Sequence, residues 1–445
     1  MTILSPILAA VVAVAPAQAS PDITGAWEGR ISVGGQSIRI VFNVAADGAT
    51  TMDSPDQGAR GIPATSAVEG RTVRFTVPAI GGRFEGLLAD DGRSLTGALA
   101  QGGMNVPLVM QRGEIAAGAS RPQTPQPPFP YRSEEVVVPT PTPGVQLAGT
   151  LAVPEGAGPF PAVLLITGSG QQDRDETVFD HKPFLVLADA LSRRGVAVLR
   201  VDDPGVGGST DRAGQSTTAD FAVDAGAAFD WLVARPETAD TRVGLLGHSE
   251  GGTIAPMVAQ TDPRVAFVVL LAGPSVRGAE VMTEQSRRMQ TAARIDPAVV
   301  DGNVAIQARI MAAIAAHPDD GDGAARAVRD SLSGVDVPPQ LLDQAAGWAA
   351  TDWARWFIAH DPQPSLRALR VPVLAIYGGK DVQVPAEQNA TALRAVLPSA
   401  EIVVLPNLNH LMQPAGTGLP AEYRTIETTL DPEALKTIVD WVAAR

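Results

Sequence analysis

The chain has 445 residues, of which 45% are hydrophobic and 18% are charged, as is typical of a folded globular protein. Its net charge of −14 argues against partners that are themselves anionic, such as nucleic acids and acidic membrane surfaces. The sequence contains no cysteine, which excludes disulfides, thiolate metal sites and cysteine nucleophiles.

The N-terminal residues have the pattern of an export signal. Residues 7–15 form an apolar run, and residues 17–19 (AQA) match the small-residue pattern of a signal-peptide cleavage site. No Lys or Arg precedes the run, although signal peptides usually begin with a positive charge. We expect residues 1–19 to be a signal peptide and the mature protein to be periplasmic or secreted. We expect no membrane span, because the run is too short and no later run reaches about 18 apolar residues.

Residues 20–112 contain short segments in which apolar and polar side chains alternate, separated by glycine-containing turns. This alternation predicts strands with one buried face, and therefore a small antiparallel β-domain, either a barrel or a sandwich. We expect Trp27 to fill its core. The expected strands cover residues 29–33, 37–44, 72–77, 83–88 and 106–110.

A proline-rich segment follows. Prolines at 122, 125, 127, 128 and 130 remove backbone donors and favour extended polyproline geometry. We expect residues 113–132 to be a linker, and this is the clearest domain boundary in the chain.

In residues 133–445, apolar runs alternate with helical stretches. Continuous apolar runs are typical of strands that are buried on both faces, and the alternation predicts a doubly wound, mostly parallel α/β sheet. The expected strands cover residues 145–153, 161–166, 195–201, 241–246, 265–271, 371–377 and 401–405, with helices at 184–194 and 219–235.

Residues 275–365 interrupt this alternation, because they contain helical stretches and no convincing strand. An insertion of this size predicts a helical cap over the carboxyl ends of the strands, where ligands bind in such sheets. Trp348, Trp353, Trp356 and Phe357 lie in its last part. We expect them mainly to pack the cap, and an apolar wall for a substrate is the alternative.

Residues 247–251 (GHSEG) directly follow an expected strand. A serine between glycines at a tight strand-to-helix turn is exposed, and the next backbone N–H is free to bind an oxyanion. The motif is short enough to occur by chance, so its support comes from an acid and a histidine later in the chain. Ser249 is the candidate nucleophile.

Asp381 and His410 are the candidate acid and base. Asp381 follows the expected strand 371–377 at its carboxyl end, and His410 follows the last expected strand. A turn aspartate is the alternative role for Asp381. The order serine, aspartate, histidine is the one that this kind of α/β sheet produces in its hydrolases.

The other four histidines are weaker candidates for the base. His248 lies inside the serine motif, and we expect it to point away from the serine. His317 and His360 lie in the expected cap, where we expect solvated or packing roles. His181 lies near the expected oxyanion loop and is the alternative base.

Two backbone N–H groups are the candidate oxyanion donors. One belongs to Glu250, directly after the nucleophile, and the other to Ser169, with Gly170 as its neighbour, in the loop 167–171 (TGSGQ). A phosphate-binding loop is the alternative for this glycine-rich turn. It is disfavoured because no GxxxxGK[ST] or GxGxxG pattern is present.

These motifs together resemble those of serine esterases and peptidases of the α/β-hydrolase superfamily, and more narrowly secreted bacterial esterases with a small N-terminal β-domain. The resemblance covers nearly the whole mature chain. It implies the α/β-hydrolase fold and places the active site among the matching stretches. These are residues 167–176 (TGSGQQDRDE), 203–209 (DPGVGGS), 247–252 (GHSEGG), 378–381 (GGKD) and 409–410 (NH).

Two positions depart from the family pattern. Many lipases have His-Gly where this chain has Thr167-Gly168, and many relatives have Arg where this chain has Pro204, which puts a salt bridge there in doubt. Within residues 173–176 (DRDE) we expect an arginine–carboxylate pair that holds the oxyanion loop in shape, joined by Asp202, Asp203 and Glu250. Direct substrate binding is the alternative.

The sequence therefore predicts a carboxylic ester hydrolase that acts on a small-molecule ester through a Ser249–His410–Asp381 triad and an acyl-enzyme. A serine peptidase or amidase of the prolyl-oligopeptidase type is one alternative, although residues 20–112 are too few for a propeller. A non-catalytic binding protein on a hydrolase scaffold is the other. No metal-ligand spacing such as HxxxH occurs, so we expect no metal and no cofactor.

Overall fold

The structure is a computed structural model that describes residues 21–33, 36–54, 59–101, 104–113, 120–335 and 337–445. The chain forms two compact units, Met1–Ala117 and Gly118–Arg445. The expected signal peptide, residues 1–19, lies outside the described residues.

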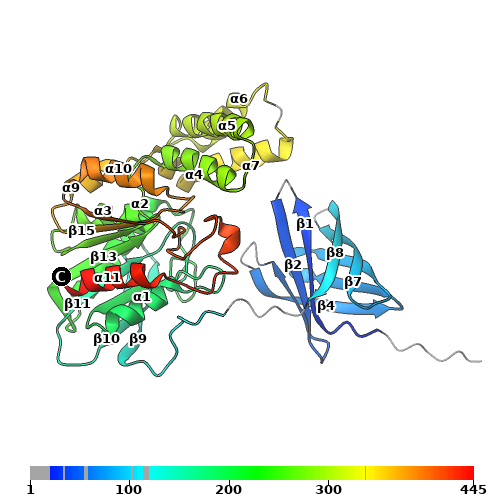
Figure 1. The fold of residues 1–445 in the computed structure, drawn as a ribbon, viewed down its shortest axis with the longest axis horizontal. Helices are drawn as coiled ribbons and strands as arrows, with labels where there is room; N and C mark the ends of the chain where they lie inside the picture. Colours follow the sequence, from blue (N-terminus) through cyan, green and yellow to red (C-terminus); the bar gives the residue numbers. More distant parts are fainter. Residues whose placement is uncertain (1–20, 34–35, 55–58, 102–103, 114–119, 336) are drawn as a thin grey trace, which may run out of the picture. The chain divides into compact units, whose positions relative to one another are not determined.

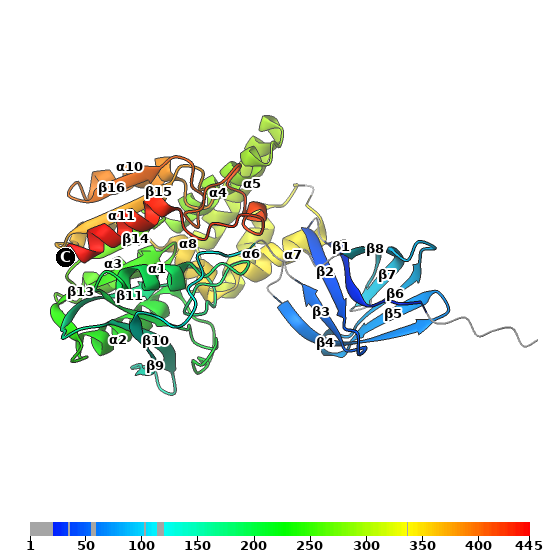
Figure 2. The same cartoon turned by 60° about the horizontal axis from the view of Figure 1, so that its bottom comes forward.

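The first unit is a closed barrel of antiparallel strands that pair in sequence order, with β1 closing on β8 (Figures 1 and 2). Trp27, Phe42, Phe75 and Phe84 are fully buried in its interior, so this core is filled with side chains. The strands are β1 (Gly25–Val33), β2 (Gln36–Val44), β3 (Thr50–Ser54), β4 (Ala59–Glu69), β5 (Thr72–Val77), β6 (Gly82–Leu88), β7 (Ser94–Gln101) and β8 (Met104–Gly113), with a 3-10 turn η2 (Pro78–Ile80).

The second unit is built on an eight-stranded sheet with the order β16-β15-β14-β13-β11-β12-β10-β9. Neighbouring strands are parallel from β16 to β12, and β10 runs antiparallel to both of its neighbours. The strands are β9 (Tyr131–Pro139), β10 (Gln146–Pro154), β11 (Phe160–Ile166), β12 (Ala197–Val201), β13 (Thr238–His248), β14 (Val268–Leu271), β15 (Val373–Gly378) and β16 (Glu401–Leu405). The predicted α/β sheet is therefore confirmed.

Helices cover both faces of this sheet, which explains why its central strands are apolar throughout (Figure 1). One face carries α1 (Pro183–Ser192) and α11 (Pro432–Ala443), and a 3-10 turn η3 (Pro420–Glu422) precedes α11. The other face carries α2 (Thr218–Val233), α3 (Gly251–Ala259), α9 (Gln363–Ala368) and α10 (Ala386–Val396).

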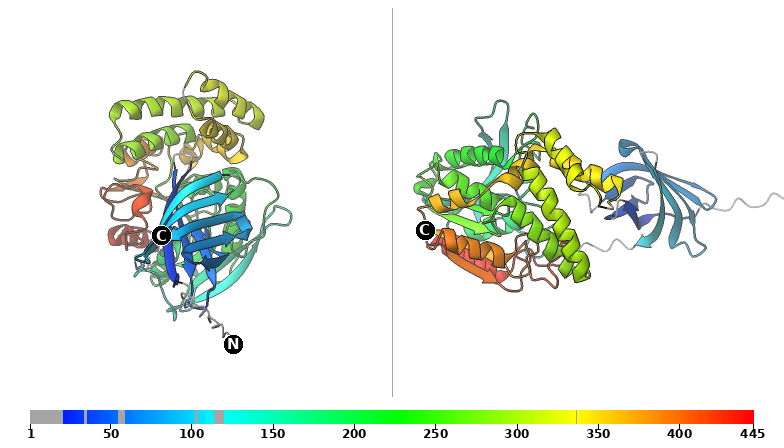
Figure 3. Two further views of the ribbon diagram at one scale, coloured as in Figure 1. Left: turned by 90° about the vertical axis from the view of Figure 1, so that its right-hand side faces the viewer. Right: turned by 90° about the horizontal axis from the view of Figure 1, so that it is seen from above.

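The predicted helical insertion between two sheet strands is also confirmed, and it lies between β14 and β15. Its helices form a layer of their own, coloured green to yellow in Figure 3. They are α4 (Gly278–Ala292), α5 (Pro297–Ala315), α6 (Gly321–Ser331), α7 (Pro339–Ala349) and α8 (Asp352–Ala359).

Among the described residues, α5 is the one helix that is long and apolar enough to cross a membrane by length and composition alone, with a mean hydropathy of 1.3. Polar residues such as Asp301 and Arg309 interrupt it, so it contains no run of about 18 apolar residues. It packs against α4, α6 and α8 of the cap.

The segment expected to be a linker is partly structured. Arg121 donates hydrogen bonds to the carbonyl oxygens of Phe179, Arg424 and Ile426, at 2.6–2.9 Å. Strand β9 begins at Tyr131, inside the range 113–132. The described residues before β9 contain turns and bends, such as the one closed by the hydrogen bond from Thr124 N–H to the carbonyl oxygen of Arg121, and composition does not indicate that this segment binds to the surface of a folded unit.

Candidate active site

Ser249 lies in the two-residue connection between β13, which ends at His248, and α3, which begins at Gly251. Its φ of +52° is rare for a residue with a side chain. A Cβ on Gly247 would lie 1.9 Å from the carbonyl oxygen of Gly251, and one on Gly251 would lie 2.2 Å from that of Ile166. The turn therefore requires glycine at both positions.

The structure brings the three candidate catalytic side chains together. His410 Nε2 lies 3.0 Å from Ser249 Oγ, and His410 Nδ1 lies 2.8 Å from Asp381 Oδ2. Because a carboxylate only accepts hydrogen bonds, Nδ1 carries the imidazole proton and Nε2 is free to accept the proton of the hydroxyl group. Asp381 and His410 are buried, and Ser249 is partly exposed.

Two glycines bring the acid loop against the histidine loop. A Cβ on Gly378 would lie 2.3 Å from the carbonyl oxygen of Leu408, and one on Gly379 would lie 2.6 Å from the Cα of Pro406. The second oxygen of Asp381 accepts hydrogen bonds from the backbone N–H groups two and three residues later, at 2.7 and 2.9 Å. These two hydrogen bonds fix the orientation of the carboxylate that contacts the imidazole.

The two candidate oxyanion donors, Ser169 and Glu250, line the same cavity as Ser249 and His410. Across the described residues, neither backbone N–H donates to an acceptor of the protein, so both are available to a ligand. The preceding N–H, that of Gly168, is already used, since it donates to Glu176 Oε1 at 2.7 Å. The site can therefore accept a proton from a hydroxyl group and stabilise a negative oxygen.

The cavity beside Ser249 has a volume of about 410 Å³, within the range of small-molecule sites. Trp353 and Phe357, which stack with ring centroids 5.0 Å apart, belong to its wall, whereas Trp348 and Trp356 do not. Two of the four aromatic residues are therefore placed where a substrate wall would be, and that role stays a prediction. The apolar lining comes mainly from the loop after Glu176, from α4 and α8, and from the loop after His410: Val178, Phe179, Val281, Met282, Trp353, Phe357, Leu411 and Tyr423.

The arginine–carboxylate pair expected within residues 173–176 forms instead between Arg174 and Asp202, and Glu250 bonds to Thr218 and Trp353 rather than joining it. Arg174 donates to both oxygens of Asp202, at 3.0 and 2.7 Å, and also contacts Glu135. Burial raises the pKa of Asp202, but the hydrogen bonds from Arg174 outweigh it and hold that pKa below its usual value. The carboxylate partner thus comes from the loop after β12.

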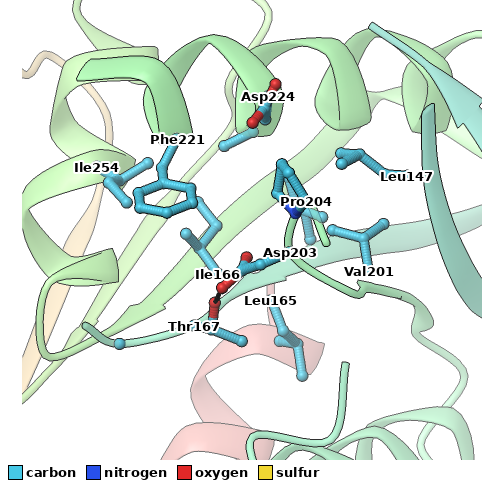
Figure 4. Close-up of a pocket in the computed structure, with 13 residues that line it drawn as sticks. Leu147, Leu165, Ile166, Thr167, Val201, Asp203, Pro204, Phe221, Asp224 and Ile254 are labelled. Atoms are coloured by element: carbon cyan, nitrogen blue, oxygen red, sulfur yellow. Dashed lines mark hydrogen bonds between the residues drawn. The ribbon is translucent and has the colours of Figure 1, made fainter. Parts of the chain in front are cut away.

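Asp203 lies beside a second, small cavity behind the oxyanion loop, together with Pro204 and Asp224 (Figure 4). It accepts a hydrogen bond from the backbone N–H of Gln172 at 2.9 Å, and the hydroxyl of Thr167 lies 3.4 Å away. Burial raises the pKa of Asp203 to about 8, and the nearby charges of other carboxylates act in the same direction.

Two histidines have partners that the sequence did not indicate. His181 is buried between the hydroxyl of Thr429 and the carbonyl oxygen of Tyr423, away from the serine. The expectation that His248 points away from the site is wrong, because it lines the cavity and its ring centroid lies 4.8 Å from that of His410. Burial lowers the pKa of His248, but the charge of Glu176 outweighs it and raises that pKa.

Sequence reasoning therefore missed the contact between Glu176 and His248. Both residues belong to stretches that the sequence singled out, but no spacing rule shows that they meet across 72 positions. Among the described residues there is no cluster of three or more His, Asp or Glu side chains that could hold a metal.

Three known proteins illustrate what this chain is similar to. Esterase EstD of Thermotoga maritima is 28% identical over 299 residues, which cover 66% of this chain and 65% of the length of EstD. An esterase of Pyrococcus furiosus, Pf2001, is 15% identical with a TM-score of 0.43, over 71% of this chain and 93% of its own. A dienelactone hydrolase from Anabaena variabilis is 20% identical with a TM-score of 0.39, over 71% and 97%.

The sequence profile of the alpha/beta hydrolase fold matches residues 161–417, more than half of the chain. The matched range includes Ser249, Asp381 and His410, and it spans the sheet from β11 to β16 together with the helical insertion. This chain therefore belongs to the α/β-hydrolase family.

Proposed function

We propose that this chain hydrolyses carboxylic esters, with Ser249 as the nucleophile, His410 as the general base and Asp381 as the residue that orients the imidazole. The proposal depends on the two hydrogen-bond distances that link His410 to Ser249 and to Asp381, 3.0 and 2.8 Å. Membership in the α/β-hydrolase family and the similarity to an esterase of Thermotoga maritima support it.

In the proposed reaction, His410 accepts the hydroxyl proton while Ser249 Oγ attacks the acyl carbon. The tetrahedral oxyanion accepts hydrogen bonds from the N–H groups of Ser169 and Glu250. His410 then transfers the proton to the leaving alcohol, which yields an acyl-enzyme. Water attacks the acyl-enzyme with His410 again as base, the acid is released and the serine is restored.

The cavity lining supports an ester with an apolar acyl or alcohol group. Apolar side chains of α4, α8 and the loop after His410 form part of the cavity wall beside Ser249. Such a wall favours aliphatic or aromatic groups, because their transfer from water contributes about 0.8 kcal/mol for each buried CH₂.

Turnover of nitrophenyl esters of graded acyl length, compared with aminoacyl anilides, tests the proposal. We expect ester hydrolysis with a preferred acyl length, and a loss of at least about 10⁴-fold in Ser249→Ala. Ser331→Ala is the matched control, because this hydroxyl lies at the end of α6 and, in the described part of the chain, bonds only to the carbonyl oxygen of Val328. Faster cleavage of anilides would favour the peptidase alternative.

Covalent labelling with a fluorophosphonate separates an enzyme from a binding protein. We expect wild-type protein to be labelled at Ser249 and Ser249→Ala to remain unlabelled. If folded wild-type protein neither reacts with the probe nor turns over any ester, the chain is a binding protein on a hydrolase scaffold and the proposal is wrong.

A further inference from the structure

A second carboxylate–imidazole pair lies directly beside the proposed triad. Glu176 Oε1 lies 2.8 Å from His248 Nδ1, and the two residues are only 3% and 5% exposed. Glu176 also has a φ of +53°, which is unfavourable for a residue with a side chain. A buried acid in a strained conformation beside an active site suggests a functional role, and the proposed ester chemistry does not assign one to it.

This pair connects three backbone segments of the site. The oxygen of Glu176 that contacts His248 also accepts the N–H of Gly168, in the oxyanion loop, at 2.7 Å. The other ring nitrogen of His248, Nε2, lies 3.0 Å from the carbonyl oxygen of His410. His248 itself directly precedes Ser249. One pair of side chains thus joins the oxyanion loop, the nucleophile turn and the histidine loop.

The fit of the oxyanion loop against this pair is close. A Cβ on Gly168 would lie 3.2 Å from Glu176 Oε1 and 3.3 Å from the Cβ of Ser249. The glycine therefore allows the loop to approach both the acid and the nucleophile, and its N–H cannot turn away without losing the hydrogen bond to Glu176.

Two observations favour a charged pair. A carbonyl oxygen only accepts, so His248 Nε2 must carry a proton in its contact with His410. Glu176 Oε1 already accepts the N–H of Gly168, which stabilises its ionised form, and an ionised carboxylate requires that Nδ1 carry the proton that the two side chains share. We therefore assign His248 as a doubly protonated imidazolium, paired with the carboxylate of Glu176. The charged and titratable groups that face it are Glu176, Asp381 and the ring of His410.

We propose that Glu176 and His248 are positioning residues for the ester hydrolysis proposed above. Glu176 holds Gly168 so that the next N–H, that of Ser169, stays available to the oxyanion, and cationic His248 holds the backbone of His410. The proposal rests on the proposed function for its kinetic consequence, but the charge of His248 is measurable without any turnover.

Kinetics of Glu176→Gln and His248→Gln test the positioning role. An amide oxygen cannot act as a counter-ion to His248, so we expect Glu176→Gln to lower kcat about 10- to 100-fold with KM nearly unchanged. The matched controls are Glu401→Gln and His360→Gln. Glu401 is the first residue of β16 and its carboxylate bonds to Trp441 of α11, and His360 lies in the cap. Variants as active as these controls would overturn the proposal.

The acid limb of the pH profile of kcat/KM distinguishes positioning through charge from simple packing. His248→Gln leaves the carboxylate of Glu176 without its cation near His410, so the limb should move to higher pH by about half a unit or more. The double variant Glu176→Gln/His248→Gln should return the limb toward its wild-type position while kcat stays low. A limb that is identical in all four proteins would overturn the charged pair.

Nuclear magnetic resonance of protein labelled with ¹⁵N-histidine measures the charge directly, because the chain has only five histidines. We expect both ring nitrogens of His248 to be protonated at neutral pH, and this signature to disappear in Glu176→Gln. A neutral His248 in the wild-type protein would overturn the proposal even if the variants fail to fold. A wild-type protein without esterase activity but with cationic His248 would instead overturn the proposed function.

Discussion

The indole Nε1–H of Trp353 donates a hydrogen bond of 2.9 Å to Glu250 Oε1, which joins the cap helix α8 to the residue after Ser249. Glu250 is buried, and the same oxygen also accepts the hydroxyl of Thr218 at the start of α2. Because the N–H of Glu250 is a proposed oxyanion donor, the cap contributes to the geometry of the site as well as to the wall of its cavity.

Replacement of Trp353 by Phe removes this hydrogen bond and keeps an aromatic ring in the cavity wall. We expect kcat/KM for esters to fall about tenfold, which corresponds to about 1.4 kcal/mol, because a buried carboxylate loses a donor. Trp348→Phe is the control, since Trp348 lies in the same cap outside the cavity and should stay within about twofold. Equal losses in the two variants would show that the indole N–H has no special role.

The sheet and the candidate triad could be predicted because their signals are local. Strand β15 is continuously apolar since both of its faces are buried, and Asp381 follows it after a glycine pair that allows the close contact with the histidine loop. In the barrel, β4 was missed because its sequence, ARGIPATSAVE, mixes Gly, Pro and small polar residues. Pairing with its neighbours makes it a strand, and pairing is not visible in one segment.

The contacts that complete the site could not be predicted in this way. His248 meets Glu176, and Arg121 meets Phe179, because the fold brings distant loops together. Each of these residues is polar and close to a recognisable motif or boundary, so the sequence marks it as notable without naming its partner. The direction in which each side chain turns depends on backbone geometry, such as the positive φ of Glu176.

Two glycine substitutions should have opposite effects on stability. Gly251→Ala places a methyl group 2.2 Å from the carbonyl oxygen of Ile166, so we expect it to lower the free energy of unfolding by about 3 kcal/mol or to prevent folding. In Gly226→Ala, inside α2, the added methyl group meets no atom within 4 Å. This substitution should raise the free energy of unfolding by up to about 1 kcal/mol. Urea titration of both variants measures the difference, and a tolerated Gly251→Ala would contradict the geometry of the turn.

Asp203 should make stability dependent on pH. Its pKa in the folded protein is about 8, against an ordinary value of 3.8, so folding favours the protonated acid. The stability that this group contributes is complete below about pH 4, declines as the pH rises and is lost above about pH 8. Asp203→Asn cannot titrate, so its stability relative to wild type should rise by about 4 kcal/mol between pH 5 and pH 9.

Urea unfolding of wild type and Asp203→Asn at pH 5 and pH 9 measures this effect. Asp319→Asn, which replaces an exposed carboxyl group on the cap, is the control and should leave the difference between the two pH values unchanged. If Asp203→Asn changed stability equally at both pH values, the acid would be ionised in the folded protein throughout that range.

Arg121 should link the proline-rich segment to the activity of the site. Its guanidinium donates to the carbonyl oxygens of Phe179, Arg424 and Ile426, and Phe179 lines the cavity beside the proposed nucleophile. We expect Arg121→Ala to lower the free energy of unfolding by about 2 kcal/mol and to raise KM for esters about threefold or more, because three carbonyl groups lose their donor and the cavity wall loosens. Arg132→Ala, which removes ion pairs of a half-exposed arginine with Glu134 on β9 and with Glu237 before β13, should change stability by less than about 1 kcal/mol and leave KM unchanged. An unchanged KM in Arg121→Ala would mean that this contact stabilises the fold without shaping the cavity.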